Sequence, residues 1–129
     1  MGRRRNRGQL TPLELEIMNV LWEGGPANVQ AVQSSLPGDL AYTTVQTMLN
    51  VLYRKGKVKR TLQGRAYLYQ PAVSREAARG RALRDMVNRL FGGSAETLVM
   101  SLVKSHRLTP AKLAELNKLI ERSQRDESA

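Results

Sequence analysis

Residues 41–56, AYTTVQTMLNVLYRKG, decide the fold of this chain. Apolar side chains in this stretch recur at i, i+3, i+4 and i+7, which is the spacing of one face of an α-helix. The apolar positions are Val45, Met48, Leu49 and Leu52. We expect this face to pack into a core and the helix to end at Gly56, a residue suited to the left-handed turn that closes helices. The sequence therefore predicts an amphipathic helix with a defined C-terminal end.

The opposite face of the same helix carries hydroxyl and amide groups, followed by a cation. Such side chains donate and accept hydrogen bonds at the edges of DNA bases. We interpret this face as a candidate recognition surface. Its residues are Thr43, Gln46, Thr47, Asn50 and Arg54.

Basic residues dominate the end of the helix and the segment that follows it. From Arg54 to Arg65 there are six cations and no acid. β-branched and aromatic residues flank a short turn at residues 63–65, so the sequence predicts a β-hairpin. A hairpin whose charges are merely solvated is the alternative, but unopposed cations beside a polar helix favour contact with phosphates. We expect the rings of Tyr67 and Tyr69 to pack on the core rather than stack on bases. The candidate phosphate-binding residues are Lys55, Lys57, Lys59, Arg60 and Arg65.

Two further helices are predicted ahead of the recognition segment. A capping-box pattern at residues 11–14, TPLE, starts a helix that should run to about residue 23. Asn28 is suited to cap a second helix that ends before Pro37. The lone Trp22 is expected to fill the core rather than to bind a ligand. Three short helices followed by a hairpin describe a winged helix-turn-helix over residues 10–73. The expected inward-facing residues of the first two helices are Leu13, Ile17, Val20, Leu21, Val29, Val32 and Leu36.

The chain changes character at Val73-Ser74, after which residues 74–122 form a separate helical module. Ser74, Ser94 and Thr109 are suited to cap three helices in turn. Three helices of this length have too little internal core to be stable alone. We expect their apolar seams to meet a second copy of the chain, with an intramolecular cap as the alternative. The candidate dimerisation residues are Leu83, Met86, Val87, Leu90, Leu98, Leu102, Leu113, Leu116 and Ile120.

Both ends of the chain lack apolar anchors. Residues 1–9, MGRRRNRGQ, are expected to form a flexible basic arm. Such an arm either contacts phosphates or a minor groove, or is a solvated tail. Residues 123–129 are expected to fray.

The composition argues for a nucleic-acid partner and against catalysis. With 21 Lys and Arg against 11 Asp and Glu, the formal charge is +10, which favours a polyanionic partner. The absence of cysteine excludes disulfides and thiolate chemistry, and His106 near a helix end is better suited to a C-terminal cap than to metal binding. Scattered carboxylates without a phosphate-binding loop predict no enzyme, cofactor or metal. Lacking an apolar run of about 18 residues or a signal peptide, the chain is expected to be soluble and cytoplasmic, without membrane insertion.

The order of these elements resembles the penicillinase-repressor family of the BlaI/MecI type, which includes CopY-like members. The resemblance rests on LTPLELEIM at residues 10–18, LAYTTVQTML at 40–49 and LYRKG at 52–56, and extends from Leu10 to about Glu121. It implies a homodimeric winged-helix transcriptional repressor on a palindromic double-stranded DNA operator. Each subunit would supply one recognition helix and one wing, with the basic wing residues on the DNA backbone. The operator-facing positions that the resemblance implies are Thr43, Thr44, Gln46 and Thr47.

Two departures from that family concern regulation. CopY-like proteins carry a C-terminal cysteine cluster, and because this chain has no cysteine, copper sensing by thiolates is excluded. Penicillinase repressors that are relieved by proteolysis are cut at an Asn-Phe bond in the middle dimerisation helix. Ser101 and Leu102 stand at the matching place, so the resemblance implies a cleavage region there with a different sequence. A membrane-bound sensor protease is the partner that such relief requires.

Two other functions are kept as alternatives. A non-specific nucleic-acid-binding or architectural protein would account for the charge, but not for the Thr/Gln/Asn face or the apolar seams. A protein-interaction adaptor is the third hypothesis, because winged helices also pair with proteins.

Overall fold

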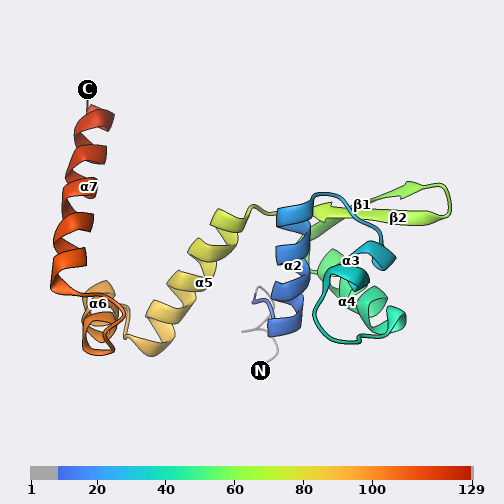
Figure 1. Ribbon diagram of the computed structural model, residues 1–129, viewed down its shortest axis with the longest axis horizontal. Helices are drawn as coiled ribbons and strands as arrows, with labels where there is room; N and C mark the ends of the chain where they lie inside the picture. The colour runs from blue at the N-terminus through green and yellow to red at the C-terminus, as the bar shows by residue number, and fades with distance from the viewer. Residues whose placement is uncertain (1–8, 129) are drawn as a thin grey trace. The chain divides into compact units, whose positions relative to one another are not determined.

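A computed structural model describes residues 9–128, so the predicted basic arm lies outside the described residues except for Gln9. The chain divides into two compact units, the first ending at Ala82 and the second beginning at Leu83. The first unit contains helices α2 (Pro12–Gly24), α3 (Val29–Ser35) and α4 (Tyr42–Arg54), then strands β1 (Val58–Gln63) and β2 (Ala66–Pro71) (Figure 1). Helix α5 (Arg75–Leu90) leads into the second unit, which holds α6 (Ala95–Lys104) and α7 (Pro110–Ser128).

Helix α2 begins with the capping box that the sequence predicts. The Glu14 backbone N–H donates to Thr11 Oγ1 at 3.2 Å, and the Thr11 N–H donates to Glu14 Oε1 at 2.7 Å. Pro12 occupies the first turn, where its missing N–H leaves no hydrogen bond unmade. The helix ends at Gly24, one residue beyond the predicted end.

Local sequence also determines where helix α3 begins and where helix α4 ends. The Ala31 N–H donates to Asn28 Oδ1 at 2.8 Å, which caps α3. Helix α4 ends in a Schellman motif, in which the N–H of Gly56 donates to Tyr53 O at 3.0 Å and that of Lys57 to Leu52 O at 2.9 Å. Gly56 has a φ of 77°, the left-handed region that glycine tolerates best. The chain therefore leaves α4 in a fixed direction and enters β1 almost at once.

The two strands form an antiparallel hairpin that is tied to the helices by backbone hydrogen bonds. Gln63 pairs with Ala66, which leaves a two-residue turn whose first residue, Gly64, has a φ of 65°. Ala27, between α2 and α3, exchanges backbone hydrogen bonds of 2.9 and 2.8 Å with Tyr69. Three helices and this hairpin make the winged helix-turn-helix that the sequence predicts (Figure 1).

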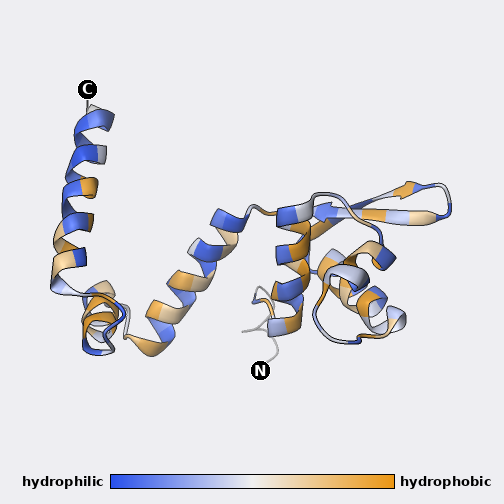
Figure 2. Cartoon of the chain, in the orientation of Figure 1, coloured by the Kyte–Doolittle hydropathy of each residue, from blue (hydrophilic) through white to orange (hydrophobic). Residues whose placement is uncertain are grey.

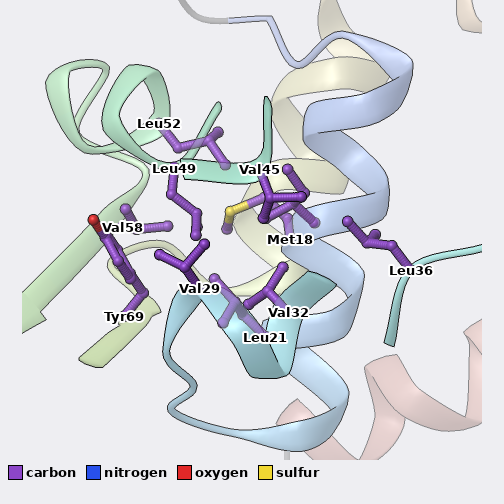
Figure 3. Close-up of a cluster of buried hydrophobic side chains, with 11 residues drawn as sticks. Met18, Leu21, Val29, Val32, Leu36, Val45, Leu49, Leu52, Val58 and Tyr69 are labelled. Atoms are coloured by element: carbon purple, nitrogen blue, oxygen red, sulfur yellow. The ribbon is translucent and has the colours of Figure 1, made fainter. Parts of the chain in front are cut away.

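One apolar core holds the first unit together. Figure 3 shows side chains from α2, α3, α4 and both strands meeting at its centre. Tyr69 is buried there, as expected, whereas Tyr67 is exposed. Leu13, Val20 and Trp22 pack against the core without being buried. The buried stripe of α2 is instead Glu14, Ile17, Met18 and Leu21.

The boundary between the units falls later than the Val73-Ser74 change that the sequence predicts. The first turns of α5 belong to the first unit because they are anchored on α2. The Trp22 indole N–H donates to Val73 O at 3.0 Å, and the Arg75 guanidinium lies 5.4 Å from the Trp22 ring centroid. Arg75 also pairs with Glu23 at 3.4 Å.

The second unit has no buried core within the residues that the structure describes. From residue 83 to residue 127 no side chain is buried, and apolar residues are distributed along all its helices (Figure 2). Ser94 and Thr109 cap α6 and α7 through hydrogen bonds of 3.2 and 3.1 Å to backbone N–H groups. Helix α7 continues to Ser128, so it includes most of the segment from residue 123 that is expected to fray. That segment contains neither Gly nor Pro, so nothing in it interrupts the helical hydrogen bonds.

Candidate nucleic-acid interface

The outer face of α4 is exposed and polar, opposite a face that is fully buried. Val45, Leu49 and Leu52 each have 0% exposure, so core packing fixes the rotation of the helix about its axis. The polar side chains therefore project from a rigid support, which suits readout of base edges. The exposed candidate recognition residues are Thr43, Thr44, Gln46, Thr47 and Arg54.

Asn50, the remaining candidate on α4, is engaged within the protein. Its Oδ1 accepts a hydrogen bond from Arg60 Nη1 at 3.1 Å and lies 3.5 Å from the Tyr69 hydroxyl. The Arg60 guanidinium is in turn 3.9 Å from the Tyr53 ring centroid and 4.3 Å from that of Tyr67. These five side chains, which we call the helix–wing clamp, join α4 to the hairpin.

The helix–wing clamp revises two predicted roles. Arg60 was expected on a phosphate and Asn50 on a base, but each has its polar group directed at the other. The sequence alone offered one signal for this contact. Asn50 and Tyr53 are three residues apart on α4, so they share a face of the helix. Arg60 and Tyr69 are paired across the hairpin, so they share a face of the two strands.

Lys55 points away from the recognition surface, into an ion pair with α2. Its Nζ lies 2.9 Å from both carboxylate oxygens of Glu14 and 3.3 Å from Gln9 O. The Glu14 side chain is 1% exposed. Burial raises the pKa of Glu14, but hydrogen bonds from the Thr11 backbone, Lys55 and the Thr11 side chain outweigh it and lower the pKa overall. Lys55 therefore serves the fold, and we remove it from the phosphate-binding set.

Lys57 is also removed from that set, because it is buried. Only 6% of the residue is exposed. Burial lowers the pKa of its ammonium, and the nearby charges of Arg81 and Lys55 lower it further, against a smaller opposite effect from Glu14. Little of this side chain is therefore available to a DNA backbone.

Three cations of the basic segment stay exposed for phosphate contact. Arg54 ends α4, Lys59 lies near the base of the hairpin and Arg65 is in its turn. Lys59 and Arg60 are consecutive in β1 and so project from opposite faces of the ribbon. Exposed cations at the end of the helix, the base of the hairpin and its tip can follow the backbone of a duplex.

The candidate dimerisation residues are spread over the three helices of the second unit. Leu83, Leu90, Leu113 and Ile120 are exposed, and Leu90 reaches 74%. Met100 and Leu119 are exposed as well. The partly buried members of the set are Met86, Val87, Leu98, Leu102 and Leu116.

Ser101 and Leu102, the implied cleavage region, lie in the middle of α6, with Ser101 exposed. His106 follows that helix with a φ of 63°, and its N–H donates to Val103 O at 3.1 Å. Among the described residues no group of three or more His, Asp or Glu side chains is placed to hold a metal ion. Within the same residues, no helix is long and apolar enough to span a membrane.

The chain is similar in sequence to known repressors. The penicillinase repressor from Bacillus licheniformis is 26% identical over 115 residues, covering 88% of this chain and 90% of that protein. The methicillin resistance regulatory protein MecI from Mammaliicoccus sciuri is 22% identical over 114 residues, covering 87% of this chain and 93% of that protein. The solution structure of the DNA-binding domain of the repressor BlaI is 31% identical, with a TM-score of 0.49, over 53% of this chain and 85% of that one.

A family model defines the relationship more firmly than any single relative. The model described as "Penicillinase repressor" matches residues 10–122, which include both units of the structure. The relatives are named as repressors and regulators, which agrees with the prediction that the chain is not an enzyme. The chain thus belongs to the penicillinase repressor family and is a DNA-binding transcriptional repressor.

Proposed function

We propose that the chain represses transcription as a homodimer on a palindromic operator, with α4 in the major groove and the hairpin along the sugar–phosphate backbone. The observation that carries this proposal is the exposed polar face of α4, held in place by a fully buried opposite face. Thr43, Thr44, Gln46 and Thr47 would contact base edges, while Arg54, Lys59 and Arg65 would neutralise phosphates. Such a protein would act in the cytoplasm.

The second unit supports dimerisation because it lacks a core of its own. Leucine and isoleucine side chains that are half exposed, such as Leu119 at 54% and Ile120 at 55%, favour association when they cluster on one module. A two-fold dimer would cover these residues with their own counterparts. Dimerisation would also link two recognition helices, so that engagement of one half-site raises the local concentration of the second.

Relief of repression by proteolysis is the part of the proposal that concerns α6. The Ser101–Leu102 peptide bond is helical, so a protease must first unfold that turn. Because α6 has no buried residue, we expect this local opening to cost little free energy. A cut there would separate α7 from the DNA-binding unit and weaken the dimer. A membrane-bound sensor protease is the partner we propose for this step.

Footprinting of the DNA upstream of the chain's own gene tests the proposal. We expect two protected half-sites related by a two-fold axis, about one or two helical turns apart. Fluorescence anisotropy should then show at least about a thousandfold preference for that site over a scrambled duplex at physiological salt. Equal affinity for both duplexes would instead identify a non-specific architectural protein, and no binding at low salt would identify a protein-interaction adaptor.

Sedimentation equilibrium tests the dimer separately from the operator. The intact chain should be dimeric at micromolar concentration, and the double substitution Leu119→Glu with Ile120→Glu should make it monomeric. Lys118→Glu is the matched control, because it adds the same charge at a neighbouring exposed polar position. A monomeric wild-type chain would contradict the role proposed for the second unit.

A further inference from the structure

The first unit contains a cavity of about 410 Å³ that the DNA-binding surface does not use. It lies between α2, the first turns of α5 and the backbone ahead of β1. Leu15 and Trp22 of α2 and Val73 supply much of its apolar wall, and alanines of α5 line the opposite side. The volume is within the range of small-molecule sites.

The charged residues that line the cavity are all cations. They are Lys57, Arg75, Arg79 and Arg81, and no carboxylate joins them. Two acids of α2 are already paired with cations, Glu14 with Lys55 at 2.9 Å and Glu23 with Arg75 at 3.4 Å. The cavity therefore combines an apolar body with a positive end.

Lys57 distinguishes this cavity from an ordinary surface hollow. The residue is 6% exposed, but its ammonium nitrogen keeps contact with solvent, because no buried side-chain nitrogen or oxygen atom among the described residues lacks a hydrogen-bond partner and this nitrogen makes no hydrogen bond. Burial of its stem and the neighbouring cations Arg81 and Lys55 lower the pKa of the ammonium, against a smaller opposite effect from Glu14. An anion in the cavity would offset the mutual repulsion of these cations and give Lys57 a partner of opposite charge at short range.

We propose that this cavity binds a small amphipathic organic anion. Its apolar body would lie against Leu15, Trp22 and Val73, and its carboxylate or sulfonate would pair with Lys57, with Arg81 close by. A second copy of the chain would cover the apolar wall but leave Lys57 unpaired. The test of this site does not depend on the function proposed above, because binding of an anion to the cavity is measured without DNA.

The probe for this site is 1-anilinonaphthalene-8-sulfonate, titrated into the full chain. Trp22 is the only tryptophan, so a probe in the cavity will quench its emission by energy transfer. We expect saturable quenching, and Lys57→Met should raise the dissociation constant by about tenfold, the scale of one lost charge-assisted hydrogen bond. Lys59→Met is the matched control, because this exposed lysine lies two residues away and outside the cavity. It should change the constant less than twofold.

A competition experiment needs no substitution and guards against a variant that fails to fold. 4-Phenylbutyrate should displace the probe from the wild-type chain, whereas 4-phenylbutanol, which lacks the charge, should displace it at least about tenfold less well. Equal displacement by the acid and the alcohol would overturn the proposal, as would equal losses in the Lys57 and Lys59 variants. Probe binding without quenching of Trp22 would place the probe elsewhere and would also overturn it.

Discussion

Replacing Lys55 by methionine should destabilise the first unit while leaving the operator contacts in place. The substitution keeps the length of the side chain and removes the ammonium that lies 2.9 Å from both oxygens of Glu14. Glu14, with a side chain 1% exposed, would keep its charge and lose its main partner. What remains is the hydrogen bond from the Thr11 N–H at 2.7 Å.

The size of the expected loss of stability follows from how deeply the Lys55–Glu14 ion pair is buried. At an effective dielectric constant near 20, two unit charges 2.9 Å apart attract by about 6 kcal/mol, part of which offsets the loss of hydration. Removing one partner of a buried pair typically costs 3–5 kcal/mol, so we expect roughly 2–4 kcal/mol here because Lys55 retains some contact with water. For a unit of this size that corresponds to a decrease in Tm of roughly 10 °C or more.

Urea unfolding followed by Trp22 fluorescence measures this change, because Trp22 belongs to the first unit. The matched control is Lys112→Met, which breaks an exposed pair with Glu115 at 3.2 Å and should cost less than about 0.5 kcal/mol. If Lys55→Met proves as stable as the wild type, the pair does not contribute to folding as argued. If it is stable and also binds DNA less tightly, Lys55 belongs on a phosphate after all.

Three further predictions concern the same surfaces. The pKa of Glu14 is lowered from its ordinary value of 4.5, so the stability that its carboxylate contributes should be complete above pH 4.5 and lost as the pH falls through the lowered pKa. The urea midpoints of the wild type and of Glu14→Gln should therefore converge at acidic pH. In anisotropy titrations, Gln46→Ala should reduce the preference for the operator over a scrambled duplex. Lys59→Ala should weaken binding to both duplexes equally and reduce the slope of log affinity against log salt concentration by about one unit. If Lys59→Ala changed the preference and Gln46→Ala did not, the proposed docking of α4 would be wrong. Arg60→Ala should speed hydrogen exchange in the hairpin while leaving the salt slope unchanged, and a slope that falls as it does in Arg65→Ala would put Arg60 on the DNA backbone.

Local sequence was sufficient to predict the elements of the DNA-binding unit. The capping box at Thr11, the cap at Asn28 and the closing turn at Gly56 each depend on hydrogen bonds that span only a few residues. The buried face of α4 follows from the period of the helix in the same way. These features were predictable because the interactions that produce them connect neighbours along the chain.

The roles of the charged residues were decided by the tertiary structure. Composition shows six cations from Arg54 to Arg65, but it does not show that Lys55 pairs with a carboxylate 41 residues earlier, or that Lys57 lines a cavity. Asn50 and Arg60 likewise look like DNA contacts until the hairpin brings them within 3.1 Å. The residue type determines the sign of a charge, whereas the group that pairs with the charge depends on which segments the core brings together. The sequence thus determined that this chain has a helix with a polar face beside a basic hairpin, and only the fold decided which of those cations stay exposed.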